Sequence, residues 1–576
     1  MKKAIALLLT VVMILGCLAA CNQTPPAGTN PPKQTTPTAA PTQPPAPTQP
    51  PETNPALGKL PLTEEDITIT IGIMQHPRVE NYDTNDFTRY IEENTGINLE
   101  FKFYANDVTE SVTQLNLEIA GQEKLPDILW GFTGINDALM YELGDDGYLV
   151  DIRDYFSEYA YWFWEECEYA SEAEIQAIFQ YGTSPTTGGF YAFPKFTSAG
   201  GDAPNSRAAI NTKWLEAVGA EMPTTVDELY EVLKKFATMD PNGNGKADEI
   251  PLLGSSQGYR TDTVQWIINA YVFCMDEYFF NATDGQVWVP YTTDEYRQAM
   301  IFLNKLYSEG LLSPLTYTIS NLSSEYMALI TPADEVPIVG CASLHPLSHY
   351  AEGSKIPEQI TPMPILKAET ELGGYGPMYD ASYEYNCFIT TDCEHPELAF
   401  QLLDFMCSQR SYLQNRYGTE GVHWDWAQPG ETSSSGEQAV IKILDSSMWA
   451  GTNNNSWHQN RGVINAGSRN TTYTDMSNPT YAQLFSIELL ARYAEAGQPE
   501  EVIRKLMYNA DEQEYVGTVM STIKEYVGEA RAMFVSGVLD PNDDAAWNTY
   551  LSNLEAQGLS KLIDTAQGAY TRMLSN

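Results

Sequence analysis

Ile67-Thr-Ile-Thr-Ile-Gly-Ile73 is the stretch of sequence that decides the fold, because its apolar residues recur at every second position. This alternation predicts a β-strand with one buried face. A helical pattern over residues 84–93 follows, and Ile97–Phe103 alternates again. A second helical pattern around Leu115 leads to the apolar strand Ile128–Trp130. The order strand, helix, strand, helix, strand predicts a largely parallel sheet covered by helices.

A second region further along the chain shows the same kind of pattern. Ala208–Ile210 is expected to form a short strand, and Thr225 with Glu228 predicts a capping box at the start of a helix. Thr292 with Glu295 predicts the start of another helix in the same way, and the end of the chain is mostly helical. Two α/β units and a helical tail predict two lobes with a ligand cleft between them.

The first twenty residues carry the pattern of an export signal. Met1-Lys2-Lys3 is positively charged and Ala4–Ala20 is apolar, which is typical of a signal peptide. The run ends in Leu18-Ala-Ala-Cys21, which resembles a bacterial lipobox. We therefore expect removal of residues 1–20 and lipidation of Cys21. Cys17 is a second candidate for lipidation, and an ordinary secreted protein is the alternative.

Residues 21–61 predict a spacer between the lipid and the folded part. Proline, threonine and glutamine dominate this stretch, and it has too few apolar side chains to offset the entropy lost on folding. In an extended polyproline form, at about 3.1 Å per residue, it reaches on the order of 100 Å. Such a reach suits the thick cell wall of a Gram-positive bacterium.

The charge of the chain excludes some classes of partner. With 32 Lys and Arg against 76 Asp and Glu, the net charge is −44, which argues against binding nucleic acid or an anionic membrane through a basic patch. Membrane contact is therefore expected through the lipid anchor only. The sequence contains no P-loop, so the energy for any transport must come from another chain.

Two residue types bear on the extracellular setting. The 35 tyrosines are typical of surfaces that bind polar ligands with apolar faces. Six cysteines follow Cys21 without metal-binding spacing. Buried free thiols and disulfides are both compatible with this sequence, with Cys387 and Cys393 as the nearest pair.

Asp240-Pro-Asn-Gly-Asn-Gly-Lys-Ala-Asp-Glu249 is the sharpest local motif. Oxygen-bearing side chains stand at positions 1, 3, 5 and 9, with glycine at position 6, as in the first part of an EF-hand calcium loop. Position 12 is Pro251 instead of glutamate, so Glu249 has to replace it if the loop closes early. A single loop predicts a structural calcium site at a helix-to-strand corner. An Asn-Gly turn without metal is the alternative.

Several stretches together resemble one family. They are Lys213–Gly219, Met222–Leu229, Asp240–Gly245, Thr293–Arg297, Leu303–Leu312, Tyr417–Trp424 and Trp547–Tyr550. In their order and spacing they resemble extracellular solute-binding lipoproteins of ABC importers, in particular the large, calcium-containing oligosaccharide-binding proteins of Gram-positive bacteria. Alginate-binding proteins are similar at a greater distance. The resemblance extends from about Leu62 to the C-terminus.

The resemblance implies an α/β fold of two lobes, periplasmic-binding-protein-like and of type II, with a helical C-terminal extension. Lobe 1 is expected to comprise residues 62–193 and 366–416. Lobe 2 is expected to comprise residues 194–365 and 417–576, including the helical tail. The implied crossovers between the lobes lie near residues 192–195, 360–366 and 416–421.

The resemblance also implies a bound structural calcium ion and a set of partners. The implied calcium ligands are the side chains of Asp240, Asn242, Asn244, Asp248 and Glu249 and the backbone carbonyl of Lys246. The implied partners are an oligosaccharide and the permease subunits of an ABC transporter, and the implied protein is a monomer without enzymatic activity. The stretch Thr316–Tyr350, with His345 and His349, departs from the family pattern, so the particular sugar is not assigned.

Sugar sites combine flat aromatic side chains with a few polar acceptors. The best cluster of this kind lies at the third implied crossover, and other candidates follow predicted strands or lie near the other crossovers. The candidate contacts are Gln75, His76, Trp130, Tyr191, Tyr375, Tyr379, Tyr417, Glu420, His423, Trp424, Trp426 and Trp457. For Trp424 and Trp426, a place in the core is the alternative.

Other functions compete with the receptor hypothesis. Gly254–Gly258 matches G-x-S-x-G, but a hydrolase also needs a positioned histidine and acid. His345 and His349 have the spacing of zinc ligands on a helix, but Pro346 lies between them and H-E-x-x-H is absent. The alternatives are a cell-surface glycoside-active enzyme, which would need two carboxylates at a set distance, or a receptor for a peptide or another non-sugar solute.

Overall fold

The computed structural model describes residues 57–197, 207–255, 261–274, 280–319, 325–344, 350, 353–376, 382–434, 436–445, 452–457, 471–503 and 505–575. The predicted signal peptide and Cys21 lie outside the described residues, as do Tyr379, Ser256 of the G-x-S-x-G match, and both His345 and His349. Within the described ranges, no helix combines the length and apolar character needed to cross a bilayer.

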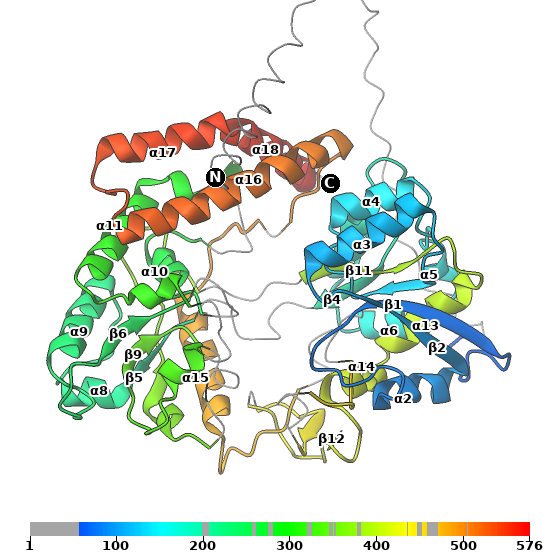
Figure 1. The fold of residues 1–576 in the computed structure, drawn as a ribbon, viewed down its shortest axis with the longest axis horizontal. Coiled ribbons are helices and arrows are strands. Elements are labelled where there is room, and N and C mark those ends of the chain that lie inside the picture. Colours follow the sequence, from blue (N-terminus) through cyan, green and yellow to red (C-terminus); the bar gives the residue numbers. More distant parts are fainter. Residues whose placement is uncertain are drawn as a thin grey trace, which may run out of the picture. The chain divides into compact units, whose positions relative to one another are not determined.

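The first sheet has five strands (Figure 1). In spatial order they are β2 (Ile97–Tyr104), β1 (Ile67–Met74), β3 (Ile128–Trp130), β11 (Ser382–Ile389) and β4 (Phe193–Thr197). β1 pairs in parallel with β2 and β3, whereas β11 runs antiparallel to β3 and β4. The predicted alternation is confirmed, because Ile69, Ile71 and Ile73 of β1 are at most 1% exposed.

Helices accompany this sheet along the chain. They are α2 (Asp86–Thr95), α3 (Val108–Gly121), α4 (Asp137–Asp145), α5 (Tyr155–Glu158), α6 (Trp162–Cys167), α7 (Glu172–Gly182), α13 (Pro396–Cys407) and α14 (Gln409–Tyr417). α2 begins where the Asn85 side chain accepts a hydrogen bond from the Phe87 N–H, and it ends at Gly96, whose φ is 75°. A Cβ on Gly96 would lie 2.2 Å from the Thr63 carbonyl oxygen, so only glycine fits there.

The second sheet has four strands, which are β10 (Ile360–Pro362), β5 (Ala209–Asn211), β9 (Val339–Ala342) and β6 (Ile250–Leu253) in spatial order. The helices in the same part of the chain are α8 (Thr212–Ala217), α9 (Val226–Thr238), α10 (Thr263–Tyr271), α11 (Asp294–Ser308) and α12 (Met327–Ile330). This part also contains a hairpin of β7 (Asn281–Thr283) and β8 (Gln286–Trp288). Its 3-10 turns are η1 (Pro290–Thr292), η2 (Pro314–Tyr317) and η4 (Ile356–Gln359). The capping box of Thr225 and Glu228 is confirmed at the start of α9. The predicted cap at Thr292 is wrong by one residue, because Thr293 accepts the hydrogen bond from the Tyr296 N–H.

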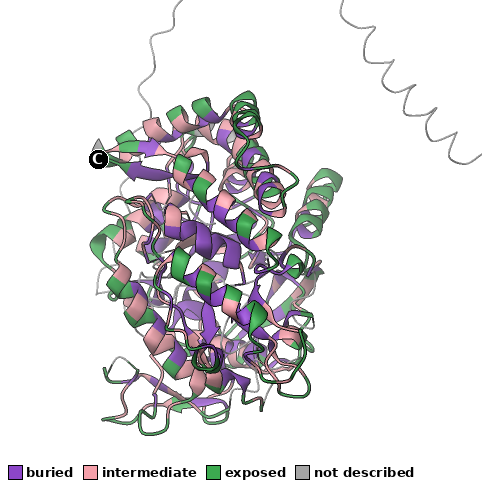
Figure 2. Cartoon of the chain, turned by 90° about the vertical axis from the view of Figure 1, so that its left-hand side faces the viewer, coloured by how far each residue is buried: buried purple, intermediate pink, exposed green. Residues whose placement is uncertain are grey.

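The C-terminal helices are α15 (Tyr481–Ala496), α16 (Ala510–Ser536), α17 (Asp544–Ala556) and α18 (Leu559–Ser575). Phe534, Trp547 and Tyr550 pack with α11 in one buried cluster, which we call the second core and which extends from Ala208 to Ala569. We call the buried cluster around the first sheet, from Ile69 to Trp457, the first core. Buried residues concentrate on the strands and on one side of the surrounding helices (Figure 2).

The chain leaves the first sheet later than the sequence indicated. The boundary expected at residues 193 and 194 falls inside β4, where Phe193 pairs with Cys387 and Lys195 pairs with Glu384 of β11. Residues 193–197 therefore belong to the first sheet, and a crossover at 192–195 does not fit this pairing.

The two later crossovers also lie further along the chain. After the expected crossover at 360–366, Leu366 is still in the second core and the Gly374 N–H donates to the Asn269 carbonyl at 2.8 Å. The expected lobe 2 included residues 417–457, but Trp457 is fully buried in the first core. The strands β12 (Trp424–Trp426) and β13 (Ile441–Ile443) form a small antiparallel sheet in this stretch.

All six cysteines of the described residues are free thiols. Five of them are buried, including Cys387 and Cys393, which form no disulfide. Burial raises the pKa of the Cys387 thiol to about 12, so this thiol stays protonated and unreactive.

Asp404 of α13 is a buried carboxylate that caps another helix. It is 1% exposed and accepts hydrogen bonds from the backbone N–H groups of Tyr161, Trp162 and Phe163 at 2.7, 3.2 and 2.8 Å. These groups form the N-terminus of α6, which leaves its first N–H groups without helical partners. Burial raises the pKa of Asp404 to about 7, although the three N–H groups act in the opposite direction.

We expect Asp404→Asn to change the pH dependence of stability. The carboxyl pKa is about 3.9 in an unfolded chain and about 7 in the folded protein, so the folded state binds the proton more tightly. The stability of the wild type relative to the variant is therefore highest at low pH and decreases as the pH rises from about 4 to about 7. Denaturant unfolding of both proteins between pH 5 and pH 8 measures this difference.

Asp564→Asn, at an exposed position on α18, is the matched control for the loss of one negative charge. If the relative stability of the wild type rises with pH instead, the helix N–H groups outweigh burial and the assigned direction of the pKa shift is wrong.

Candidate functional site

The loop between α9 and β6 holds the predicted calcium ligands. Asp240, Gly243 and Gly245 have φ values of 47°, 69° and 74°, so the backbone turns tightly through left-handed conformations. The Asp240 carboxylate accepts hydrogen bonds from the N–H groups of Asn244 and Gly245 at 3.1 and 3.0 Å. The Asn244 side-chain oxygen accepts from the Lys246 N–H at 2.7 Å. These contacts turn the oxygen-bearing side chains toward the inside of the loop.

One carboxylate oxygen of Glu249 in this loop lacks a partner. Its Oε1 atom is buried and makes no hydrogen bond with any described residue. Burial raises the pKa of Glu249, and the carboxylates of Asp248 and Asp240 raise it further. A buried carboxylate oxygen beside two other carboxylates is an unfavourable arrangement without a cation.

The donor set of the loop fits calcium better than a transition metal. The side-chain amides of Asn242 and Asn244 donate to Asp248 at 3.3 and 3.0 Å, and an amide turned about its Cβ–Cγ bond presents its oxygen instead. Among the described residues, no group of three or more His, Cys, Asp and Glu side chains is arranged to hold a metal. An ion in this loop would therefore need amide and backbone oxygens together with carboxylates, which is the ligand set that calcium accepts.

The predicted sugar cluster at residues 417–426 is largely a small core. Trp424 is fully buried and its Nε1–H donates to the Gly418 carbonyl at 2.7 Å. Tyr417 is 7% exposed and lies in the same cluster as Leu413 and Ile441. Trp424 therefore lies in a core, which was the alternative for this residue, and Tyr417 is buried in the same cluster.

Glu420 and Trp426 form the accessible part of this region. Both carboxylate oxygens of Glu420 accept hydrogen bonds from Arg410, at 2.7 and 2.8 Å, and Trp426 Nε1–H donates to Glu420 at 3.1 Å. The Arg410 guanidinium lowers the pKa of Glu420, so this side chain is a carboxylate at neutral pH. Sequence reasoning missed Arg410, which occupies much of the acceptor capacity of Glu420.

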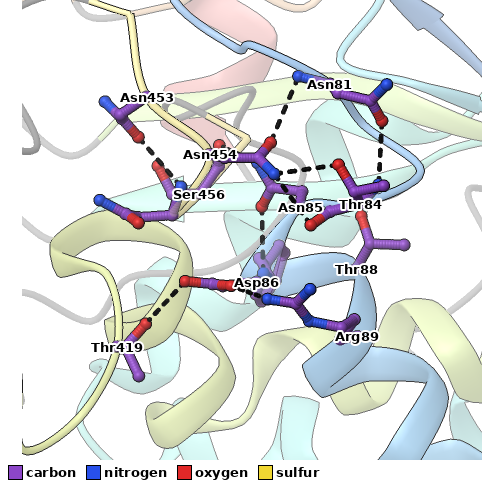
Figure 3. A network of polar contacts seen from close by, with 12 residues as sticks. Asn81, Thr84, Asn85, Asp86, Thr88, Arg89, Thr419, Asn453, Asn454 and Ser456 are labelled. Atoms are coloured by element: carbon purple, nitrogen blue, oxygen red, sulfur yellow. Dashed lines mark hydrogen bonds and ion pairs between the residues drawn. The ribbon is translucent and has the colours of Figure 1, made fainter.

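A polar network joins the segment around Asn454 to the start of α2 (Figure 3). The Asn454 amide donates to the carbonyl and hydroxyl oxygens of Thr84 at 2.9 and 3.1 Å and accepts from the Asn81 N–H at 3.2 Å. The Asn85 amide donates to the Ser456 carbonyl at 3.0 Å. These bonds tie the segment around Asn454 to the residues that precede α2.

Trp457 follows this network and lies inside the first core. Its ring meets Phe87, Phe101 and Trp130 edge to face, with centroids 5.1, 5.4 and 5.6 Å apart. Its Nε1–H donates to the Thr88 hydroxyl at 2.8 Å. Trp457 and Trp130 are both 0% exposed, so both rings lie inside the first core.

The remaining predicted contacts differ in accessibility. Gln75 is exposed and His76 is half-buried after β1, and burial and Arg78 lower the pKa of His76. Tyr375 is half-buried and its hydroxyl donates to the Glu371 carbonyl at 3.2 Å.

Two further predicted contacts are buried. Tyr191 is 6% exposed and its hydroxyl lies 2.9 Å from both Asp145 and Thr187. His423 is 7% exposed; its Nδ1 accepts from the Thr419 N–H at 2.9 Å and its Nε2 lies 3.1 Å from the Asn455 amide. Both side chains already use their polar atoms within the protein.

Sequence reasoning missed a cavity of about 420 Å³. Its wall comes from four separate stretches of chain, so no local motif marks it. The lining residues are Asn136, Asp137, Ala138, Tyr141, Gln180, Tyr181, Thr183, Pro185, Phe280, Ile503, Lys505, Leu506, Met507, Tyr508, Gln513, Val516, Gly517, Met520 and Lys524. The size lies within the range of about 300–1,000 Å³ found for small-molecule sites, and the wall combines aromatic rings with amide groups.

Known proteins share both sequence and fold with this chain. The fructooligosaccharide ABC transporter substrate-binding protein FusA of Streptococcus pneumoniae is 29% identical over 228 residues, which are 38% of this chain and 40% of FusA. Lipoprotein LipO of Bacillus subtilis is 38% identical over 109 residues, which are 18% of this chain and 20% of LipO. The chain thus spans at most about two fifths of the length of these relatives in the matched regions.

A solved structure confirms the predicted fold. An EF-hand mutant of S. pneumoniae FusA, in complex with fructo-nystose, superposes with a TM-score of 0.69 at 20% identity, over 88% of this chain and 100% of that one. The chain therefore has the predicted two-lobed, type II α/β fold with a helical C-terminal extension.

Family membership follows from the sequence match. The profile of the family described as "Bacterial extracellular solute-binding protein" matches residues 80–411, which is more than half of the chain. The description of this family is one of solute binding and names no catalytic activity. The resemblance seen in the sequence is confirmed, and the chain belongs to the bacterial extracellular solute-binding protein family.

Proposed function

We propose that this chain captures an oligosaccharide outside a bacterial cell, as a monomer, and delivers it to the permease subunits of an ABC importer. The observation that carries the proposal is the family match over residues 80–411. The relative FusA, described as a fructooligosaccharide ABC transporter substrate-binding protein, supports a sugar as the ligand. The chain supplies recognition, and the permease complex supplies the energy for transport.

The accessible side chains suit a sugar. Sugar rings have apolar C–H faces that stack on aromatic rings, and their hydroxyls bond to amides and carboxylates. Among the predicted contacts, Gln75, His76, Tyr375, Glu420 and Trp426 have surface available for a ligand. We propose these five as contacts, whereas the buried rings act by holding the surrounding backbone in place.

Glycan binding should raise the melting temperature of the protein. A ligand that binds only the folded state at about 100 times its Kd adds about 2.7 kcal/mol of stability. We expect at least one hit in a thermal-shift screen of a glycan library, with mass spectrometry recovering that glycan unchanged.

Two other outcomes of the screen would contradict this function. Shortened glycans would favour a cell-surface glycoside-active enzyme. A library without hits, followed by hits in a peptide library, would favour a receptor for a non-sugar solute.

We also propose a structural calcium ion in the loop 240–249. The side chains of Asp240, Asn242, Asn244, Asp248 and Glu249 and the backbone carbonyl of Lys246 would hold it. The buried, unpartnered Oε1 of Glu249 supports this proposal, as does the EF-hand named for the FusA structure. The ion would offset two of the three negative charges of Asp240, Asp248 and Glu249 and fix the corner between α9 and β6.

Glu249→Gln should separate calcium binding from folding. Without calcium the variant should be at least as stable as the wild type, because a neutral amide replaces a carboxylate whose pKa burial raises. The rise in melting temperature on adding calcium should shrink, and the calcium Kd from titration calorimetry should increase about tenfold or more.

Glu555→Gln, in α17 and distant in sequence from this loop, is the matched control and should keep the full calcium response. A wild-type melting temperature that does not change when EGTA is added would overturn the structural calcium site.

We propose that a lipid on Cys21 anchors the protein to the outer face of the cell membrane. The lipobox-like Leu18-Ala-Ala-Cys21 supports this anchor, and the relative LipO is described as a lipoprotein. One acyl chain gives weak, reversible membrane binding, so stable attachment requires more than one chain, such as palmitate groups on a diacylglyceryl cysteine.

Cys21→Ser should abolish this attachment. In a bacterial host, the wild type should fractionate with membranes and its N-terminal peptide should carry the mass of a lipidated cysteine. The variant should lack the lipid mass, whereas Cys17→Ser, the matched control, should behave as the wild type. Loss of the lipid in Cys17→Ser with retention in Cys21→Ser would move the anchor to Cys17.

A further inference from the structure

The segment 57–63 connects the expected spacer to β1 and forms neither helix nor strand. Residues 57–61 are the last of that expected spacer. β1 lies between β2 and β3 in the first sheet, so a spacer that entered β1 directly would act on a central strand. A chain end frays unless contacts hold it. The contacts of residues 57–63, which we call the clamp segment, therefore decide how far movement of the spacer reaches.

The clamp segment is held first at the C-terminus of α2. The Thr95 carbonyl accepts hydrogen bonds from the N–H groups of Leu62 and Thr63 at 2.8 and 3.2 Å. The last carbonyls of a helix lack helical partners, and Thr95 is fully buried, so these two bonds satisfy a group that water does not reach. The Leu62 side chain packs against the first core. Polar and apolar contacts therefore act together at this point.

The clamp segment is held a second time at Tyr161. A Cβ on Gly58 would lie 2.7–2.8 Å from three carbon atoms of the Tyr161 ring, so the Gly58 backbone lies directly against that ring. The φ of Gly58 is 70°, a left-handed conformation that favours glycine. Tyr161 is itself fixed, because its N–H donates to Asp404 at 2.7 Å and its ring meets Trp162 edge to face with centroids 5.5 Å apart. A side chain on residue 58 would therefore separate the clamp segment from the first core.

The contact with Thr95 lies at the amino ends of two parallel strands, because Ile67 of β1 pairs with Ile97 of β2. Gln75 and His76, two of the proposed sugar contacts, follow the other end of β1. The eight residues of β1 span about 26 Å at about 3.3 Å per residue. Open α/β sheets bind ligands at the carboxyl ends of their strands. The spacer therefore joins the first sheet at the end opposite to the ligand end.

We propose that the clamp segment fixes the membrane tether to the first core and prevents movement of the spacer from reaching β1. It combines two backbone hydrogen bonds, one apolar side chain and one contact between a glycine and a ring, so it can open locally while the rest of the first core stays folded. The proposal goes beyond the receptor function and needs no ligand. With a lipid on Cys21, the protein would be held to the membrane by the amino ends of β1 and β2, and the ligand end would stay free of the tether.

Trypsin reports whether the clamp segment is closed. Lys59 lies inside it and is exposed, and no other Lys or Arg lies between Lys33 of the expected spacer and Arg78. A protease cuts a structured segment only through its transient opening. In a short digestion of the full-length protein made in a bacterial host, we expect the cut after Lys59 to be at least about tenfold slower than the cut after Lys33. Mass spectrometry separates the products, which begin with Leu60 and Gln34.

Gly58→Ala should open the clamp segment. The added Cβ collides with the Tyr161 ring and the left-handed φ becomes strained. The cut after Lys59 should therefore become about tenfold faster or more, whereas the cut after Lys33 keeps its rate. Gly219→Ala is the matched control, because its φ is 59° and a Cβ there would meet no atom within 4 Å. It carries similar backbone strain without the collision and should be cut as the wild type is.

Tyr161→Ala tests the same contact from the side of the ring. It removes the ring and keeps the N–H that donates to Asp404, and it should also speed the cut after Lys59 by about tenfold. Tyr148→Ala removes another partly exposed ring, which is 36% exposed, and should leave the rate of this cut unchanged.

A wild-type cut after Lys59 that is as fast as the cut after Lys33 would overturn the clamp, because the segment would then be free. An unchanged rate in Gly58→Ala or Tyr161→Ala would overturn it too. An equal increase in Gly219→Ala would have the same consequence, because the effect would then come from strain elsewhere in the protein.

Arg89 distinguishes local opening from unfolding. It lies in α2 and is cut only when this helix opens, so a joint increase of the cuts after Arg89 and Lys59 would assign the effect to unfolding and overturn the clamp. A wild type without a lipid would overturn the anchor on Cys21 alone, because the digestion measures the clamp segment with or without the lipid.

Discussion

The position of β11 between β3 and β4 is the constraint on which the rest of the structure depends. Cys387 of β11 pairs with Trp130 of β3 on one side and with Phe193 of β4 on the other. β11 follows all four strands of the second sheet in the sequence. The first sheet is therefore complete only when a strand from beyond the second sheet joins it. This topology makes the second sheet an insertion and forces the chain to pass between the two parts.

Such non-local pairing carries an entropic cost that the first core has to offset. Closing a long loop costs free energy that increases slowly with loop length, and burial of large rings is the strongest opposing contribution available. The first core contains a dense group of aromatic side chains around Trp457, which lies on the same later passage of the chain as β11. Trp457 therefore fixes the last loop of the first part before the chain leaves for α15.

Local features of the fold were predictable, because they depend on neighbouring residues only. The alternation of Ile67–Ile73 predicts a strand from seven neighbouring residues. The capping box of Thr225 and Glu228 predicts the start of a helix from two residues three positions apart. The cap at Thr293 was missed by one residue because Thr292 and Thr293 are both threonines, and either hydroxyl could cap the helix. Only the backbone of η1, which ends at Thr292, distinguishes them.

The candidate site was less predictable, because the exposure of an aromatic ring depends on distant partners. Trp424 and Trp426 are two positions apart in the sequence, yet one is fully buried and the other is half-exposed. Trp457 follows a polar stretch whose sequence is typical of a surface loop. However, Asn454 and Ser456 form hydrogen bonds with residues at the start of α2. The cavity beside Lys505 combines four distant stretches, and no periodicity or motif connects them.

The scarce cations of this acidic chain show how the C-terminal helices are attached. Arg297 bonds to the Pro541 carbonyl at 2.8 Å and pairs with Asp544, and Arg531 of α16 pairs with Asp262 at 3.1 Å. These two arginines reinforce an attachment to the second core that already buries Phe534, Trp547 and Tyr550. Arg531 and Asp262 are both 16% exposed, so salt screens this pair weakly, whereas Asp544, the partner of Arg297, is 83% exposed.

The C-terminal helices are attached to the first core by a different kind of contact. At the cavity, Lys505 forms an ion pair with Asp137, whereas the apolar residues next to it belong to the second core. An ion pair that is about 30% exposed contributes less than a buried apolar contact. The C-terminal helices are thus tightly joined to one part of the protein and weakly joined to the other.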